Sequence, residues 1–195
     1  MKRLLATVSF VAAFAVVGPV CAREQGNPAF ATPGTQSASG MPASNEANVT
    51  DRNFARAAAA GGLSEVELGR LADQKGQSSE ARAFGQRMAN DHSKANNQLK
   101  ELGAAANIPL PDAPSSDDQK VREQLDQTQR NAFDRDYIRG QIAAHQQAVQ
   151  LFEYEIGSGQ DSRLKSFASQ TPPVLMQHLE MAKDMDAHLT GAADQ

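Results

Sequence analysis

After residue 48, apolar residues recur at steps of three and four along almost the whole chain, which is the spacing of one face of an α-helix. The first such stretch predicts a helix over about residues 51–75 that ends before Gly76. A second predicted helix follows Ser78 and Ser79 and continues to about residue 102. Because the turn between them is short, we expect these two helices to form an antiparallel hairpin.

A proline-rich connection over about residues 103–115 comes next. It contains Pro109, Pro111 and Pro114, and so many prolines do not allow a helix to continue. Ser116 and Gln119 then resemble a capping box, which predicts the start of a short helix. The pattern leaves open whether this short helix merges into the long helix that follows.

Two further long helices form the second predicted hairpin. The third helix ends at Gly157 and Gly159, and the fourth runs from near Asp161 to near Leu189. Within the fourth helix, residues 171–173 read Thr-Pro-Pro and predict a kink or a brief break.

The fold class follows from these elements and from the composition of the same region. Ala, Gln, Leu, Arg and Glu dominate it, β-branched residues are few, and strand signals are absent from the sequence. We therefore predict one all-α domain over residues 49–191. Its expected architecture is an antiparallel four-helix bundle in which a long connection joins two helical hairpins.

The first 22 residues have the pattern of a secretory signal peptide. Lys2 and Arg3 precede an apolar stretch over residues 4–17, and a small-residue cleavage pattern ends at Ala22. We expect cleavage there and a periplasmic or secreted location. Lipidation of Cys21 is the alternative, although the preceding Gly-Pro-Val is a poor match to such a site.

Removal of the signal peptide changes the expected composition of the mature chain. Residues 23–48 are rich in small and polar residues and are expected to form a disordered linker. Cleavage leaves 17 basic against 23 acidic residues, a formal charge of −6, which argues against nucleic acid and anionic lipid as partners. Cys21 is the one cysteine, so a mature chain has no disulfide and no thiolate ligand. No later segment of the sequence is apolar enough to cross a bilayer.

Candidate chemistry lies on the apolar faces of the four long helices. His92, His145 and His178 each stand where an apolar residue is expected, and Glu65 lies on the apolar face of the first helix. Counted from the turns, Glu65 pairs with His145 and His92 pairs with His178. The two pairs differ by about five residues, or about 8 Å along the axes, so a single compact site is not required.

Four segments of the chain resemble the bacterial domain of unknown function 4142 family, whose members look like exported, ferritin-like four-helix proteins. These segments are residues 54–71, 83–99, 133–155 and 164–183. The resemblance implies a ferritin-like bundle in the cell envelope. It also places Asp91 and the four candidate residues within recognisable blocks of the family, and it implies no established activity.

The sequence lacks the ligand pattern of ferritin-like di-metal enzymes, in which a Glu precedes a His by three residues. Ala89, Ile142 and Leu175 stand three residues before His92, His145 and His178. This disfavours an oxygen-activating di-iron carboxylate centre. Imidazole remains suited to zinc, copper, iron or nickel as a divalent transition-metal cofactor.

Two functional hypotheses therefore stay open. In the first, which we favour, the chain is a non-enzymatic envelope or stress-related module that binds a protein partner, and Glu65 or Asp91 hydrogen-bonds the buried histidines. In the second, Glu65, His92, His145 and His178 bind a metal ion. The sequence shows no nucleophile with its base, no phosphate-binding loop and no nucleotide fingerprint, so we assign no catalytic residue.

Overall fold

The structure, a computed structural model, describes residues 47–191, and in this range all regular elements are α-helices. The predicted signal peptide, Cys21 and nearly all of the predicted linker lie outside the described residues. The all-α fold class is confirmed for the range described. The six helices are α1 (Val49–Lys75), α2 (Ser79–Ala105), α3 (Ser116–Gln127), α4 (Arg130–Ser158), α5 (Ser162–Gln170) and α6 (Pro172–Gly191).

Helix starts are set by short polar side chains in extended backbone. Asn48 caps α1 by accepting a hydrogen bond from the Asp51 amide, and Ser78 caps α2 in the same way from Ala81. The predicted capping box at Ser116 was wrong by one residue, because Ser115, which follows a proline, has the extended backbone and accepts from the Asp118 amide. The caps therefore fix where the first three helices begin.

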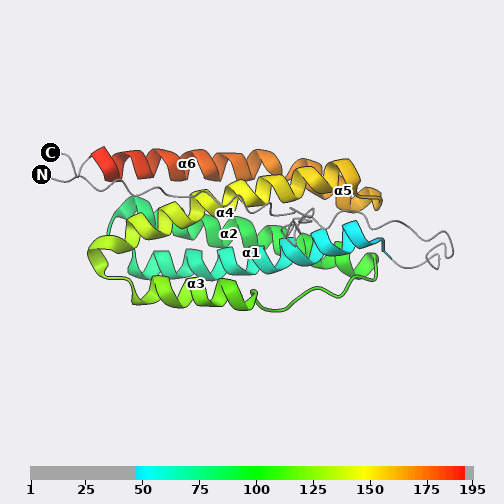
Figure 1. Cartoon of the computed structure of the whole chain (residues 1–195), viewed down its shortest axis with the longest axis horizontal. Coiled ribbons are helices and arrows are strands. Elements are labelled where there is room, and N and C mark those ends of the chain that lie inside the picture. Colours follow the sequence, from blue (N-terminus) through cyan, green and yellow to red (C-terminus); the bar gives the residue numbers. More distant parts are fainter. Residues whose placement is uncertain (1–46, 192–195) are drawn as a thin grey trace, which may run out of the picture. The chain divides into compact units, whose positions relative to one another are not determined.

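The short helix does not merge into the next one. Thr128 and Gln129 both have extended backbone, with ψ of 138° and 146°, and they separate α3 from α4. α3 lies along the outside of α1 (Figure 1) and buries only Leu125 among its own residues. Two ion pairs also hold it to α1: Lys75 with Asp126 at 2.9 Å and Glu67 with Arg122 at 3.4 Å.

The α1–α2 hairpin is packed closely enough for backbone contact. A Cβ atom placed on Gly85 would lie 2.6 Å from the carbonyl oxygen of Gly69, and one on Gly69 would lie equally close to the Gly85 carbonyl. A side chain at either position would keep the helices apart. Further along, Gly62 faces Asn96, so the two helices stay in contact over much of their length.

Of the two alternatives predicted for the last helix, a kink or a brief break, the structure has the brief break, in which the single residue Thr171 separates α5 from α6. The Thr171 hydroxyl donates a hydrogen bond to the Phe167 carbonyl, and Pro172 opens α6. Proline has no amide hydrogen to continue the ladder of α5 and is well suited to the first helical position. The chain therefore restarts as a new helix that packs along α4.

The interior consists of two apolar clusters. The cluster that reaches α5, called the α5-side cluster, is built around Phe54, Leu99, Phe152, Leu164, Phe167 and Leu175. The cluster that includes Leu125 of α3, called the α3-side cluster, is built around Leu68, Phe84, Met88, Phe133, Ile138 and Ala182. Between these two clusters, each of the four long helices carries one of the candidate polar residues. These are Glu65 on α1, His92 on α2, His145 on α4 and His178 on α6.

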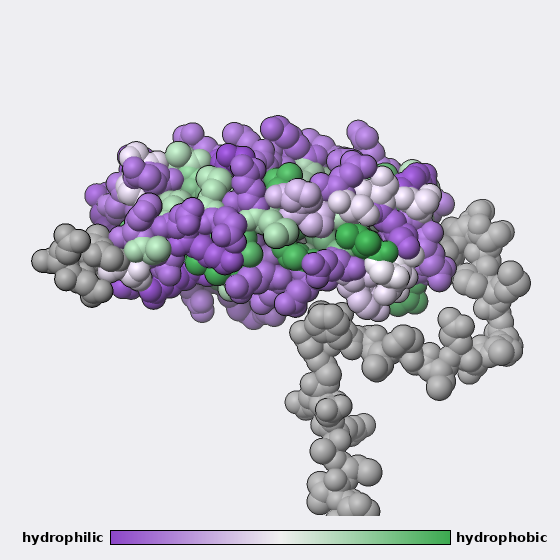
Figure 2. All heavy atoms as spheres, turned by 90° about the horizontal axis from the view of Figure 1, so that it is seen from above, coloured by the Kyte–Doolittle hydropathy of each residue, from purple (hydrophilic) through white to green (hydrophobic). Residues whose placement is uncertain are grey.

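The surface is mostly hydrophilic. On the face that carries α6, Figure 2 shows small apolar patches separated by polar side chains, and Val174 and Met176 of α6 are exposed. No helix within residues 47–191 has the length and apolar character needed to cross a bilayer.

Candidate functional site

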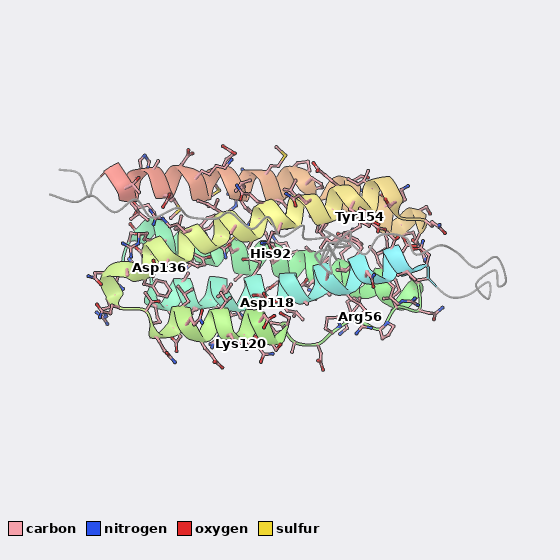
Figure 3. The ribbon with its side chains drawn as sticks, in the orientation of Figure 1. Arg56, His92, Asp118, Lys120, Asp136 and Tyr154 are labelled. Atoms are coloured by element: carbon pink, nitrogen blue, oxygen red, sulfur yellow. The ribbon has the colours of Figure 1, made fainter. Side chains whose placement is uncertain are left out.

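Three imidazole rings meet between the two apolar clusters. The ring centroids of His92 and His145 lie 5.6 Å apart, those of His92 and His178 also 5.6 Å, and those of His145 and His178 5.4 Å. One ring nitrogen from each residue lies within 4.8 Å of the other two. We call these three residues the histidine cluster. His92 lies near the middle of the length of the helices (Figure 3).

His145 is held by its own helix. Its Nδ1 atom lies 3.0 Å from the carbonyl oxygen of Gln141, one turn earlier in α4. A carbonyl oxygen only accepts hydrogen bonds, so Nδ1 carries the proton and Nε2 has a free lone pair. His145 Nε2 is buried and has no hydrogen-bond partner among the described residues.

His178 is held by a side chain from another helix. Its Nε2 atom lies 3.2 Å from Oδ2 of Asp91 on α2, while Nδ1 is buried with no partner among residues 47–191. For His92, Nε2 is the buried atom that lacks a partner in that range. Each member of the histidine cluster thus has one unpaired ring nitrogen in the interior.

Burial keeps these rings neutral. Desolvation, followed by repulsion from the other two rings, lowers the pKa of His92 to about 3. Desolvation and the neighbouring His178 lower the pKa of His145 to about 4. Burial also lowers the pKa of His178, against the opposing effect of Asp91. At neutral pH the cluster therefore has three uncharged imidazole rings, each with one nitrogen lone pair that can bind a metal ion.

Such a donor set fits a transition-metal ion. In a tetrahedral site with metal–nitrogen bonds of about 2.0–2.1 Å, the ligand nitrogens are about 3.4 Å apart. The nitrogens of the histidine cluster lie within 4.8 Å of one another, so metal binding requires them to move somewhat closer together. Metal-bound histidines usually donate their second N–H to a carbonyl or carboxylate, as His145 does to Gln141 and His178 to Asp91.

The predicted axial offset between the candidate residues was wrong. Gly62 faces Asn96 and Gly69 faces the stretch from Gly85 to Ala89, which puts Glu65 level with His92. In the second hairpin, Arg139 pairs with Asp186, which puts His145 within about one turn of His178. Counting from the turns failed because the relative level of two helices is set by the contacts between them, such as that of Gly69 with Gly85, and not by the number of residues from the turn.

Glu65 lies on α1 at the level of His92, but it does not belong to the group of residues whose ligand atoms converge. It is 7% exposed, and its carboxylate is hydrogen-bonded by the side chain of Gln141. Desolvation, with a further contribution from Asp118, raises the pKa of Glu65 to about 7. Asp118 is on α3 (Figure 3), the helix that packs against α1.

The sequence matches the family model described as "Domain of unknown function (DUF4142)" over residues 36–185. The chain belongs to this family. It is also similar in structure to a DUF305 fragment from Deinococcus radiodurans, with a TM-score of 0.65 and 12% sequence identity. That match covers 73% of this chain and 99% of the other, and at this identity it concerns the fold alone. No curated protein matches this chain in sequence.

Sequence reasoning missed Gln141, a buried polar residue of this DUF4142 chain. Gln141 is 1% exposed and links Glu65 to His145 through its side chain and its carbonyl, and Tyr137 is 1% exposed in the α3-side cluster. Burial and the nearby Glu65 raise the pKa of Tyr137 well above its ordinary value. Helical spacing offered a signal, because Gln141 stands one turn before His145 and one turn after Tyr137 on the same face of α4.

A second buried polar group closes the far end of the domain. Asp51 is 2% exposed and accepts hydrogen bonds from the backbone amides of Gln160 and Asp161, at 2.8 and 3.0 Å. Glu155 is fully buried beside it, and desolvation together with Asp51 raises the pKa of Glu155 to about 8. Asp51 ties the start of α1 to the turn after α4, which gives it a structural role, whereas both carboxylate oxygens of Glu155 are buried without a hydrogen-bond partner among the described residues.

Proposed function

We propose that this protein binds a transition-metal ion through His92, His145 and His178. The observation that supports the proposal is the convergence of three imidazole rings from three helices, each with one buried ring nitrogen that has no hydrogen-bond partner among the described residues. Structural stability does not explain this arrangement. A buried polar atom without a hydrogen bond costs about 1–3 kcal/mol, and apolar side chains would fill the same space without that cost.

The alternative hypothesis, a histidine layer satisfied by carboxylates, accounts for less of the geometry. Asp91 hydrogen-bonds one nitrogen of His178, and Glu65 hydrogen-bonds Gln141 instead of a histidine. A metal ion would use the remaining nitrogen of each ring. Zinc, copper, iron and nickel all suit imidazole ligands.

We propose Glu65 as the neighbouring carboxylate that offsets the charge of the bound ion. It lies level with His92, and its Oε2 atom is buried without a partner among the described residues. In this role Glu65 contributes to affinity through its negative charge. The three histidines contribute as ligands, so their loss has the larger effect.

The packing of α1, α2, α4 and α6 favours a ferritin-like, antiparallel four-helix bundle as the fold type, with α3 added on its outer side. The signal-like pattern of residues 1–22 favours action in the periplasm or outside the cell. We accordingly propose an exported, non-enzymatic protein that binds or buffers metal.

Elemental analysis and calorimetric titration of the purified full-length chain test the metal proposal. We expect about one ion per chain and a loss of affinity of at least about 100-fold in His92→Ala, His145→Ala and His178→Ala. His188→Ala is the matched control, because His188 lies in the last turn of α6 and its side chain is exposed. Glu65→Gln is expected to weaken binding less than any of the three histidine substitutions.

Two results would overturn the proposal. One is a wild-type chain that binds zinc, copper, iron and nickel no better than the His145→Ala variant does. The other is an equal loss of binding in His188→Ala, which would assign the metal to surface histidine. Circular dichroism of each variant shows whether the helices are intact, so that a loss of binding is not confused with unfolding.

A further inference from the structure

We propose that Asp91 is a positioning residue of the histidine cluster, and that its carboxylate selects the tautomer of His178 in which the lone pair is on Nδ1, the nitrogen left free for the metal. This inference rests on the proposed metal site for its function. Its structural part, the tautomer, exists without any metal and is tested separately below.

The tautomer follows from hydrogen-bond chemistry. Asp91 Oδ2 lies 3.2 Å from His178 Nε2, and an ionised carboxylate only accepts hydrogen bonds. The proton of a neutral His178 must therefore be on Nε2. The lone pair is then on Nδ1, which is the buried nitrogen without a partner among the described residues.

The two other contacts of Asp91 keep its carboxylate in place. Arg87, one turn earlier in α2, lies 3.5 Å from Asp91 Oδ2, and Lys94 lies 3.5 Å from Oδ1. The Asp91 side chain is 26% exposed, and its Oδ2 atom contacts both Arg87 and the buried His178, while its Oδ1 atom contacts Lys94. The contact with His178 spans α2 and α6, whereas both cation contacts stay within α2.

Asp91 also differs from the group that orients His145. Gln141 orients His145 through a backbone carbonyl of the same helix, which is neutral and cannot be removed by a substitution. Asp91 orients a ligand from another helix through a charged side chain, and it directly precedes the ligand His92. A single stretch of α2 thus supplies one ligand and fixes another. Carboxylates that hold a metal-bound histidine in this way raise its basicity as a ligand.

The first experiment reads the tautomer directly in the metal-free full chain. Long-range proton–nitrogen NMR correlations of the imidazole rings distinguish protonated from unprotonated ring nitrogens. We expect His178 to be protonated on Nε2 in the wild type and to become a mixture of tautomers in Asp91→Ala. Asp91→Asn should keep only part of the wild-type preference, because its amide oxygen accepts from a protonated Nε2 while its amide NH2 group can instead donate to an unprotonated Nε2.

The second experiment measures the zinc affinity of the same variants. Asp91→Ala is expected to bind zinc about 10- to 100-fold more weakly, which is the usual effect of removing the partner of a metal-bound histidine. Asp91→Asn, which loses the charge but can still accept the hydrogen bond from Nε2, should fall between Asp91→Ala and the wild type. Asp117→Asn is the matched control, since Asp117 also pairs with a lysine three residues later but is exposed and contacts no histidine.

The outcomes separate this inference from the proposed function. A wild-type His178 protonated on Nδ1, or an Asp91→Ala variant with unchanged tautomer and unchanged affinity, overturns the role of Asp91. An equal loss of affinity in Asp117→Asn also overturns it, because the effect would then be one of net charge. If the wild type binds no metal, the proposed function fails, and the NMR result alone decides whether Asp91 sets the tautomer.

Discussion

The two helical hairpins both contribute to the histidine cluster, but they are held together in different ways. In the first, α1 and α2 touch through the backbone at Gly69 and Gly85. In the second, a Cβ on Gly140 or Gly157 of α4 would meet nothing within 4 Å. There α4 is joined to α5 by aromatic side chains, with Phe152 and Phe167 centroids 5.7 Å apart, and to α6 by Arg139 and Asp186.

Because of this difference in packing, we expect the two hairpins to respond differently when the cluster binds a metal ion. Backbone contact leaves α1 and α2 little freedom to slide, so His92 and Glu65 keep fixed relative positions. The second hairpin supplies His145 and His178 and is packed through side chains, which adjust more easily than backbone does. We therefore expect the contraction of the cluster on metal binding to come mainly from α4 and α6.

The largest expected effect comes from a substitution that forces α1 and α2 apart. In Gly85→Ala the new methyl group would lie 2.6 Å from the Gly69 carbonyl oxygen and 2.8 Å from the Ala72 Cβ, so the helices must separate. We expect the free energy of unfolding to fall by at least about 3 kcal/mol, at the upper end for an overpacked core. Urea denaturation monitored by circular dichroism measures this change.

The control for that variant is Gly61→Ala on α1, where the new methyl group meets nothing within 4 Å. Alanine is favoured over glycine inside a helix by about 1 kcal/mol, so this substitution should stabilise the protein. Equal effects of the two substitutions would show that backbone contact does not hold the first hairpin.

The contrast between the hairpins also explains what the sequence could predict of the fold. Helical spacing and the turn residues located the helices, because these signals are local. Ser115 was missed as the cap of α3 in favour of its neighbour, and the packing of α3 on α1 was not foreseen. A helix with one buried apolar residue, Leu125, gives little sign of where it docks.

For the candidate site, the sequence predicted which residues are present but not how they are arranged. His92, His145 and His178 were identified because each interrupts an apolar face, and the structure brings their rings together. Their common level was not predicted, since it depends on how α1 packs against α2 at Gly69 and Gly85, a contact that the spacing of apolar residues does not reveal. The role of Glu65 as a metal ligand stays a prediction.

The second prediction concerns the contact between the hairpins, where Glu65 of α1 meets Gln141 of α4. The pKa of Glu65 is raised from 4.5 to about 7, so its protonated form stabilises the fold below pH 4.5 and this contribution is lost as the pH rises through 7. At pH 8 the cost of ionising Glu65 is about 3 kcal/mol. The free energy of unfolding of Glu65→Gln, relative to that of the metal-free wild type, should therefore rise by about 3 kcal/mol between pH 4 and pH 8.

Glu67→Gln is the control for this measurement, because the Glu67 side chain on the same helix is 43% exposed. Denaturant titrations of both variants at several pH values give the comparison. A stability difference between Glu65→Gln and the wild type that stays constant over this range would contradict the buried, protonated state of Glu65.

The third prediction concerns acid and the second hairpin. The pKa of His145 is lowered from 6.5 to about 4, so neutral His145 contributes stability above pH 6.5 that is lost as the pH falls toward 4. When the pH falls from 7.5 to 5, the free energy of unfolding of the metal-free wild type should decrease by about 2 kcal/mol more than that of His145→Gln. His188→Gln, at an exposed position, should follow the wild type, and an identical loss in His145→Gln would show that His145 is not buried as a neutral ring.

The smallest expected effect is at the surface of the second hairpin. Arg139 on α4 and Asp186 on α6 form an ion pair at 2.9 Å, but their side chains are 52% and 27% exposed. A solvent-screened pair of this kind contributes less than about 1 kcal/mol, so Arg139→Gln should change stability slightly and leave zinc affinity unchanged. Arg135→Gln is the control, because Arg135 pairs with Asp136 of its own helix and joins no two helices. Denaturation in low and high salt measures both variants, and a loss above about 2 kcal/mol in Arg139→Gln alone would mean that this ion pair, and not side-chain packing, holds α6 against α4.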